Sequence, residues 1–105
     1  MVQNVDQGSK GEDLLFGTDL NDKMIGKAGD DWFYESAGDD LIKGGRGTDT
    51  VRLDGSQSDY LFDKNKDGSF TVTNLVTDDT DLLISIEEVD FADDWSGAYD
   101  IDDLV

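Results

Sequence analysis

The residues that could do chemistry in this chain are carboxylates spaced nine positions apart. Of its 105 residues, 26 are acidic and 8 are basic, and none is cysteine or histidine. The lack of these two residue types excludes disulfides, Cys/His zinc sites and histidine-based catalysis. Carboxylates and backbone carbonyls remain, and their hard oxygens suit calcium or magnesium. One aspartate recurs at the same place in five consecutive nine-residue units: Asp13, Asp22, Asp31, Asp40 and Asp49.

The five units run without a break from Gly8 to Arg52. They read GSKGEDLLF, GTDLNDKMI, GKAGDDWFY, ESAGDDLIK and GGRGTDTVR. Glycine at the first and fourth places lets a tight loop reach positive φ, so that consecutive carbonyls can point to one spot. The last three residues should be extended with only the middle one, in the eighth place, facing inward. That place is always apolar: Leu15, Met24, Phe33, Ile42 and Val51.

This pattern resembles the nonapeptide repeat of the repeats-in-toxin (RTX) family, G-G-x-G-x-D-x-U-x with U apolar, a calcium-binding β-helix repeat. The resemblance implies an all-β fold, a parallel β-roll (a right-handed two-sheet solenoid) in which two units make one coil. It implies calcium between loop n and loop n+2, held by carbonyls and aspartates of both loops. The first, third and fifth loops would then share one edge, here called the odd edge. The second and fourth loops would share the other, the even edge.

The odd edge keeps the family pattern better than the even edge does. Leu20 stands where the second loop requires glycine, and Glu35-Ser36-Ala37 replaces the opening glycines of the fourth loop. We therefore predict two calcium sites on the odd edge and a weaker or absent third site on the even edge.

The resemblance assigns ligands to each site. The odd-edge sites pair Asp13 with Asp31 and Asp31 with Asp49, and the even-edge site would use Asp22 and Asp40. The complete odd-edge set is Gly8, Lys10, Gly11, Asp13, Gly26, Ala28, Gly29, Asp31, Gly44, Arg46, Gly47 and Asp49.

The nine-residue phase ends at Arg52, which divides the chain into four predicted parts. Residues 1–7 are a leader, 8–52 the repeats, 53–95 a C-terminal β capping segment of antiparallel strands, and 96–105 an acidic and apolar tail. A bare solenoid end exposes strand edges and needs a cap. The alternative for 53–95 is a surface that binds a glycan or a protein partner.

Polar and apolar residues alternate in 59–62 and in 69–73, which predicts two strands joined by a hairpin turn. The turn, Asp63-x-Asn65-x-Asp67-Gly68, also copies the opening of an EF-hand loop. Asn74 replaces the twelfth-place glutamate of such loops, so we interpret the segment as a turn. Residues 48–93 as a whole resemble the β segment that follows RTX repeats in secreted bacterial proteins.

Four large apolar side chains should point outward from neighbouring strands. An exposed apolar patch of this size would be unusual, so we expect the C-terminal segment to cover it. The alternatives are an intermolecular contact and a carbohydrate-stacking surface. The residues are Leu14, Phe16, Trp32 and Tyr34.

The net charge of −18 should keep the chain unfolded until cations neutralise it. With the resemblance, this predicts a secreted, extracellular bacterial module that folds on calcium and supports type I secretion and folding of a larger protein. Its partners would be calcium ions and the type I secretion machinery. Residues 99–105 resemble the uncleaved signals of that pathway, and an unstructured acidic tail is the alternative.

Other function classes find less support. An acidic chain gains no electrostatic binding energy from nucleic acid, which is also negatively charged. No apolar run reaches the roughly 18 residues of a membrane span. No histidine is present to activate a nucleophile, so we predict no enzyme activity. The alternative function is an adhesin or polysaccharide-binding module with structural calcium, in which Lys43, Arg46 and Arg52 meet an acidic polymer such as alginate.

Overall fold

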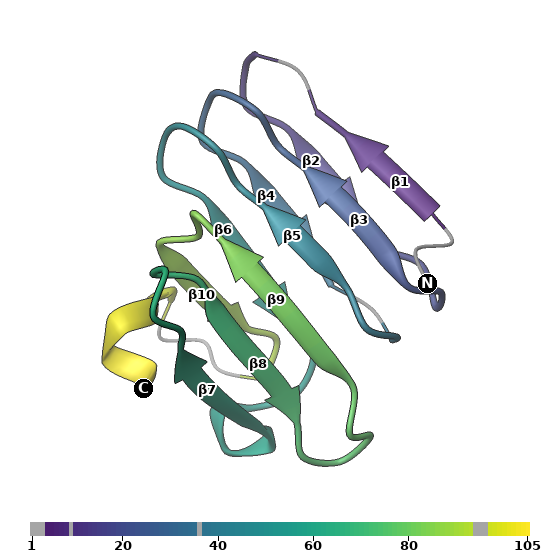
Figure 1. Ribbon diagram of the computed structural model, residues 1–105, viewed down its shortest axis with the longest axis vertical. Coiled ribbons are helices and arrows are strands. Elements are labelled where there is room, and N and C mark those ends of the chain that lie inside the picture. The colour runs from purple at the N-terminus through teal and green to yellow at the C-terminus, as the bar shows by residue number, and fades with distance from the viewer. Residues whose placement is uncertain (1–3, 9, 36, 94–96) are drawn as a thin grey trace.

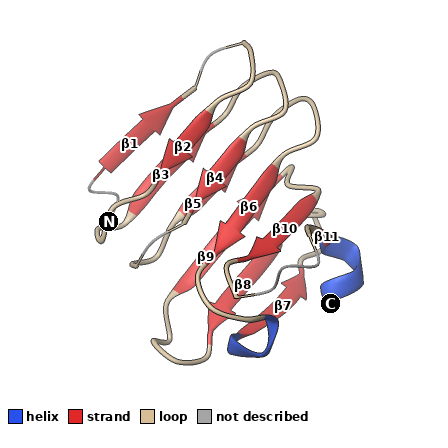
Figure 2. Cartoon of the chain, turned by 180° about the vertical axis from the view of Figure 1, so that it is seen from behind, coloured by secondary structure: helices blue, strands red, loops and turns tan. Residues whose placement is uncertain are grey.

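The chain folds into two β-sheets packed face to face, as the computed structural model shows (Figure 1, Figure 2). It describes residues 4–8, 10–35, 37–93 and 97–105. One sheet contains, in spatial order, β1 (Asn4–Gln7), β3 (Asp22–Ile25), β5 (Leu41–Lys43), β9 (Thr80–Ile84), β8 (Phe70–Asn74) and β7 (Tyr60–Lys64). The other contains β11 (Tyr99–Asp100), β10 (Glu88–Phe91), β6 (Thr50–Leu53), β4 (Trp32–Tyr34) and β2 (Leu14–Phe16). Two short 3-10 helices, η1 (Gln57–Asp59) and η2 (Ile101–Leu104), complete the described elements.

The repeats stack in parallel with a register of two units. Met24 of β3 is opposite Ile42 of β5, and in the other sheet Leu15 is opposite Phe33, which is opposite Val51. Each strand is three or four residues long because the glycine loops take up the rest of every unit. The predicted parallel β-roll is confirmed, with odd and even loops at opposite edges.

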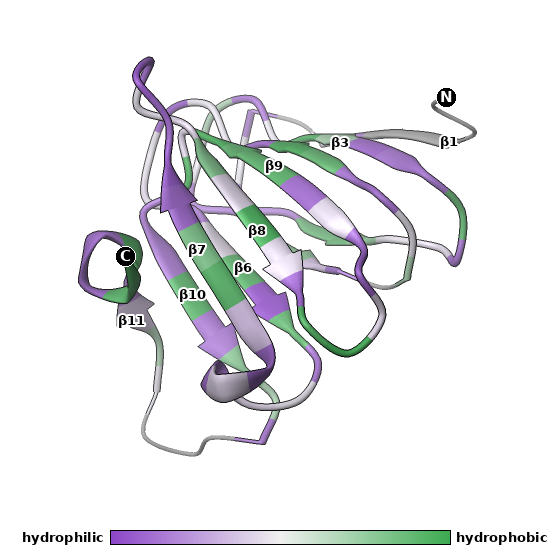
Figure 3. Ribbon diagram, turned by 60° about the horizontal axis from the view of Figure 1, so that its bottom comes forward, coloured by the Kyte–Doolittle hydropathy of each residue, from purple (hydrophilic) through white to green (hydrophobic). Residues whose placement is uncertain are grey.

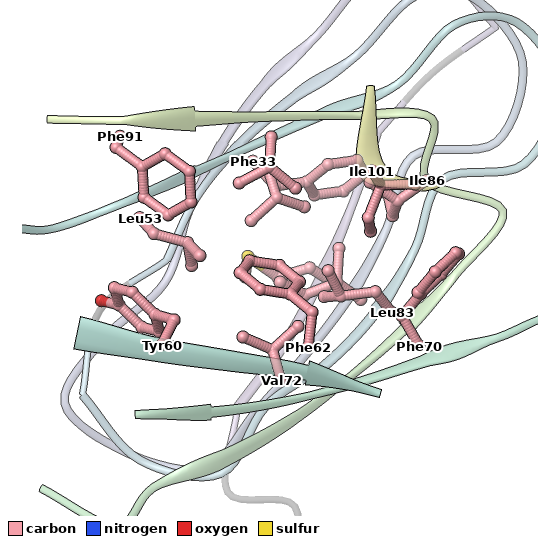
Figure 4. Close-up of a cluster of buried hydrophobic side chains, with 14 of the residues drawn as sticks. Phe33, Leu53, Tyr60, Phe62, Phe70, Val72, Leu83, Ile86, Phe91 and Ile101 are labelled. Carbon is pink, nitrogen blue, oxygen red and sulfur yellow. The ribbon is translucent and has the colours of Figure 1, made fainter. Parts of the chain in front are cut away.

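The core fills the space between the two sheets. All five eighth-place residues are buried, because pleat alternation turns them toward the opposite sheet. At the C-terminal end the core widens, where Phe62, Phe91 and Ile101 pack together with the residues in Figure 4. Figure 3 shows the matching alternation of hydrophobic and hydrophilic residues along β10. Burial of each large apolar side chain stabilises the fold by roughly 1.5–3 kcal/mol.

The C-terminal segment continues the roll before it caps it. β9 runs parallel to β5 and β10 parallel to β6, with Leu83 opposite Ile42 and Val89 opposite Val51. Antiparallel strands follow outside them, β8 and β7 in one sheet and β11 in the other. The cap is therefore mixed, and one further coil without glycine loops lies between the repeats and the antiparallel strands.

The predicted hairpin joins β7 to β8. The carboxylate of Asp67 accepts hydrogen bonds from the backbone N–H of Ser69 at 2.9 Å and from its hydroxyl at 2.6 Å. The amide of Asn65 donates to the Ser69 and Thr71 hydroxyls. These side chains hold the turn, so the EF-hand resemblance has a local structural explanation.

Described residues near both ends of the chain belong to the fold. Residues 4–7, set apart above as a leader, form β1 beside β3. In the predicted tail, β11 pairs with β10, and Ile101 of η2 is 2% exposed within the core. A frayed acidic tail therefore does not describe residues 99–104.

The outward apolar patch is not covered, contrary to our expectation. Leu14 is 61% and Phe16 58% exposed, and the ring of Phe16 stacks on Tyr34 at 4.8 Å between centroids. The C-terminal strands add to the edges of both sheets and do not cross their outer faces. Edge addition is favoured because each new strand pairs its backbone groups with an open strand edge.

Candidate metal sites at the edges of the roll

The odd-edge aspartates form a ladder of hydrogen bonds. The backbone N–H of Asp13 donates to Oδ1 of Asp31 at 2.9 Å, and the N–H of Asp31 donates to Oδ1 of Asp49 at 3.0 Å. The N–H of Asp49 then donates to Oε1 of Glu87 at 2.8 Å. The carboxylates of Asp31, Asp49 and Glu87 are thus each fixed through one oxygen by a neighbouring loop, and each has a second oxygen.

Two of these second oxygens have no partner in the protein. Oδ2 of Asp31 and Oδ2 of Asp49 accept no hydrogen bond. Both residues are 0% exposed, so both oxygens are buried. Leaving a buried carboxylate oxygen unpaired is costly. The structure therefore meets the first requirement of a cation site, which is buried hard oxygen ligands.

Backbone carbonyls face the same two oxygens. A Cβ built on Gly26 would contact Oδ2 of Asp31 and lie 2.9 Å from the carbonyl oxygen of Gly44. A Cβ on Gly44 would lie 2.5 Å from Oδ2 of Asp49 and would also contact the carbonyl of Ser85. Carboxylate and carbonyl oxygens thus converge on a space that any larger residue would fill. First-place glycine is required for this room.

We expected positive φ at both the first-place and the fourth-place glycines. In the third and fifth loops only the fourth-place glycines have it. Gly29 and Gly47, in the fourth place, have φ values of 95° and 96°. Gly26 and Gly44, in the first place, do not have positive φ. The positive φ predicted for the first place is therefore wrong in these two loops, where glycine instead leaves room beside the aspartate oxygens.

Electrostatics also favour a cation at the odd edge. Burial is the main cause that raises the pKa of Asp49 to about 7, and the negative charges of Asp31 and Glu87 add to it. Burial likewise raises the pKa of Asp31. Like charges held together away from water are unfavourable unless a cation or protons neutralise them.

The even edge begins with a loop that satisfies its own aspartate. The N–H of Thr18 donates to Oδ2 of Asp22 at 2.7 Å, and the Thr18 hydroxyl donates to Oδ1 at 2.9 Å. The N–H of Asp22 donates to Oδ1 of Asp40 at 2.8 Å, which repeats the ladder of the odd edge. Both carboxylate oxygens of Asp22 already have partners, which gives a physical reason for a weaker site there.

Two residues that were not predicted as ligands extend both ladders beyond the repeats. Asp81 accepts from the N–H of Asp40 at 2.8 Å, and Glu87 takes the same role for Asp49. A signal for them exists. An acidic residue stands two positions before a buried apolar one at 81–83 and at 87–89, as at the sixth and eighth places of every repeat.

The remaining predicted ligands lie in the odd-edge loops, which stack on one another. The N–H of Arg46 donates to the carbonyl of Lys27 at 3.0 Å. A Cβ on Gly29 would lie 2.6 Å from the Gly11 carbonyl oxygen, and one on Gly47 would lie 2.5 Å from that of Gly29. The predicted carbonyl positions, which are Lys10, Gly11, Ala28, Gly29, Arg46 and Gly47, all lie between the strands on this edge.

A protein-family model that describes four copies of the RTX calcium-binding nonapeptide repeat matches residues 7–33, 16–51 and 36–61. Together these ranges span more than half of the chain. The chain belongs to the RTX repeat family. It is therefore a calcium-binding β-roll module, and RTX repeats are structural, not catalytic.

A solved structure supports the same conclusion. The RTX chain resembles the crystal structure of the extracellular lipase LipA from Serratia marcescens, with a TM-score of 0.73 and 26% identity. The match covers 84% of this chain but 14% of the lipase, so the chain spans about one seventh of that protein. No curated protein matches the chain significantly in sequence.

Proposed function

We propose that this RTX chain is a calcium-driven folding module of a secreted, extracellular bacterial protein, which it helps to pass through a type I secretion system. The observation that carries the proposal is the pair of buried, unpartnered carboxylate oxygens on Asp31 and Asp49. Without a cation the roll must bury this charge within a chain of net charge −18. Low calcium then favours the unfolded chain, and high calcium favours the roll.

The proposed odd-edge ligands combine carboxylates with loop carbonyls. They are the carboxylates of Asp13, Asp31 and Asp49 and carbonyls from the three stacked loops. At a free calcium concentration of 100 times the dissociation constant, each ion adds about 2.7 kcal/mol to stability. Two or three ions would contribute an amount similar to the 5–15 kcal/mol of a typical domain, which is enough to decide whether the chain folds.

The site assignment predicts unequal effects for two matched substitutions. Asp31→Asn should weaken calcium binding by about tenfold or more, because Asp31 serves two neighbouring sites and ligand charge sets affinity. Asp22→Asn should have a smaller effect, because both Asp22 oxygens are already bonded within the second loop. Isothermal titration calorimetry of both variants makes the comparison. Equal losses, or a larger loss for Asp22→Asn, would contradict the assignment.

The secretion role is tested in cells that carry a type I exporter. We propose that residues 99–105 contain the export signal, so a chain that lacks them should stay inside the cell. Phe62→Ala is the control, because it removes a buried side chain from the same core and leaves residues 99–105 intact. Full chain and control should reach the medium equally well. Export of the shortened chain at the same level would remove these residues from the signal.

A second candidate function is glycan binding, and the uncovered aromatic patch favours it. Trp32 is half-buried on the same outer face as Phe16 and Tyr34, and the Arg52 guanidinium lies 5.8 Å from the Tyr34 ring centre. Aromatic faces with a polar rim suit sugar rings. The basic residues proposed to meet an acidic polymer are less suited to it. Lys43 and Arg52 lie in different sheets, and Arg52 pairs with Asp90 at 3.6 Å.

Binding of the calcium-loaded chain to alginate and to a neutral glycan separates the two functions. The patch predicts preference for the neutral polymer, because net charge opposes a polyuronate. Trp32→Ala should remove this binding while calcium-induced folding persists. Folding without binding to either polymer would leave the folding module as the function.

A further inference from the structure

Three carboxylates meet on the even edge where the repeats end. One oxygen from each of Glu35, Asp40 and Asp81 lies within 4.8 Å of those from the other two. Asp40 and Asp81 are 3% and 2% exposed, and Glu35 is half-buried. Asp81 comes from β9, outside the repeats, so the group forms only when the C-terminal segment packs beside β5.

Glu35 occupies a position that the odd-edge loops reserve for glycine. Its N–H donates to the Arg52 carbonyl at 3.1 Å, just as the N–H of Gly26 donates to Lys43 at 2.9 Å. The space beside Gly26 receives a carbonyl from the next loop. After β6 the chain leaves the nine-residue pattern at Asp54, so the fourth loop has no complete following loop. The Glu35 side chain brings a carboxylate into this place.

An unpartnered oxygen points to a ligand at this position. Oδ1 of Asp40 accepts from the Asp22 N–H, but its buried Oδ2 accepts no hydrogen bond. By equivalence with Gly26 and Asp31, this oxygen faces the first place of its own repeat, which is Glu35. The Asp40 carboxylate is therefore held through Oδ1, and its Oδ2 has no hydrogen-bond partner.

The surroundings are acidic and firmly held. Burial is the main cause that raises the pKa of Glu35, Asp40 and Asp81, and neighbouring carboxylates add to it. The two ion pairs among the described residues, Arg52–Asp90 and Lys64–Asp102, involve other carboxylates.

Further hydrogen bonds fix the loop, and a small cavity adjoins it. The Thr80 N–H donates to Asp39 at 2.7 Å, and the Gly38 N–H donates to Asp79 at 3.2 Å. A cavity of about 220 Å³ borders one member of the group, because Glu35, Asp54 and Tyr60 are among its lining residues.

We propose that Glu35, Asp40 and Asp81 form a calcium site with three carboxylates at the junction between the repeats and the C-terminal segment. It differs from the odd-edge sites because a glutamate side chain replaces a loop carbonyl and a residue outside the repeats completes it. Three carboxylate ligands suit calcium, whose oxygen shell is large and flexible. The site would link calcium binding to docking of β9. This inference rests on the proposed calcium-driven folding but concerns a separate ion.

The test counts calcium ions on the full chain. Wild type, Glu35→Gln and Asp81→Asn are stripped with chelator and titrated with calcium by calorimetry, and bound ions are counted by equilibrium dialysis. Asp103→Asn is the control, because it removes the same charge from an exposed position in η2. Both site variants should lose one ion, or bind it at least about tenfold more weakly. The control should match the wild type.

Circular dichroism in saturating calcium shows whether each variant folds. Glu35→Gly, which restores the glycine of the other repeats, is a second variant in which the carboxylate is absent and the loop has room. Folded variants that bind the same number of ions with unchanged affinity would overturn the site and leave a protonated carboxylate group in its place. If Asp31→Asn loses affinity while wild type and Glu35→Gln are identical, calcium-driven folding stands and this site fails. If the wild type binds no calcium, the proposed function itself fails.

Discussion

Addition of millimolar calcium to the chelator-treated chain should convert its far-ultraviolet circular dichroism spectrum from disordered to β-rich. The metal-free roll would bury Asp31, Asp40 and Asp49 with unpartnered oxygens in a chain of net charge −18. Calcium supplies the missing partner and neutralises charge, and because the sites are absent from the unfolded chain, its binding energy becomes folding energy. We expect a cooperative transition that chelator reverses.

Magnesium is the matched control for this transition. It is smaller, requires nearly octahedral geometry and loses its water reluctantly, so equal concentrations should leave the chain disordered. Sodium chloride at equal ionic strength separates binding from general screening. An unchanged spectrum after calcium addition would contradict the folding proposal. Equal folding by magnesium or by sodium chloride would show that charge neutralisation alone is sufficient.

Ending the chain after Leu53 should abolish calcium-dependent folding. The shortened chain lacks β9 and β10, which cover Ile42 and Val51 through Leu83 and Val89. It also lacks the whole C-terminal part of the core, including Phe62, Phe70 and Phe91. Each lost apolar contact of this size costs roughly 1.5–3 kcal/mol, so the sum exceeds what two or three ions can provide. We expect disorder or aggregation in millimolar calcium.

A chain ending at residue 95 is the control for this truncation. It retains β9 and β10 and should fold with calcium, because these two strands extend the roll beyond β5 and β6. The structure adds that it should be less stable than the full chain by about 2–5 kcal/mol, because Ile101 is buried in the core. Analytical ultracentrifugation and circular dichroism measure both chains. A monomeric, cooperative, calcium-dependent β signal from residues 1–53 would show that the C-terminal segment is not needed as a cap.

The repeats are the part of this protein that sequence describes well. An acidic sixth place, an apolar eighth place and glycines at fixed positions recur at a constant interval, so every unit is subject to the same local constraint. The resemblance to RTX repeats then implied the two edges of the roll. The strands, their register and the burial of Met24, Phe33 and Ile42 agree with this reading.

The C-terminal segment was predicted less completely because its partners are distant in sequence. Alternation identified the β7–β8 hairpin, a local feature. It could not show that β9 and β10 extend the two sheets in parallel, since strand pairing over about forty residues depends on which edges are open. The same uncertainty explains the wrong expectation for Leu14 and Phe16, which stay exposed because the later strands add at the edge.

The sequence by itself determined the chemistry of this protein, which is hard oxygen ligands repeated on a loop frame in a chain with a large negative charge. Only the tertiary structure decided which oxygens are left without a partner. Asp31 and Asp49 each accept a hydrogen bond from the backbone N–H of the loop eighteen residues earlier, and the other oxygen of each stays without a partner. Asp81 and Glu87 join the ladders only through packing of the last coil. The physical reason is that a ligand set depends on distances between loops, and these are fixed when separate strands pair, not by spacing along the chain.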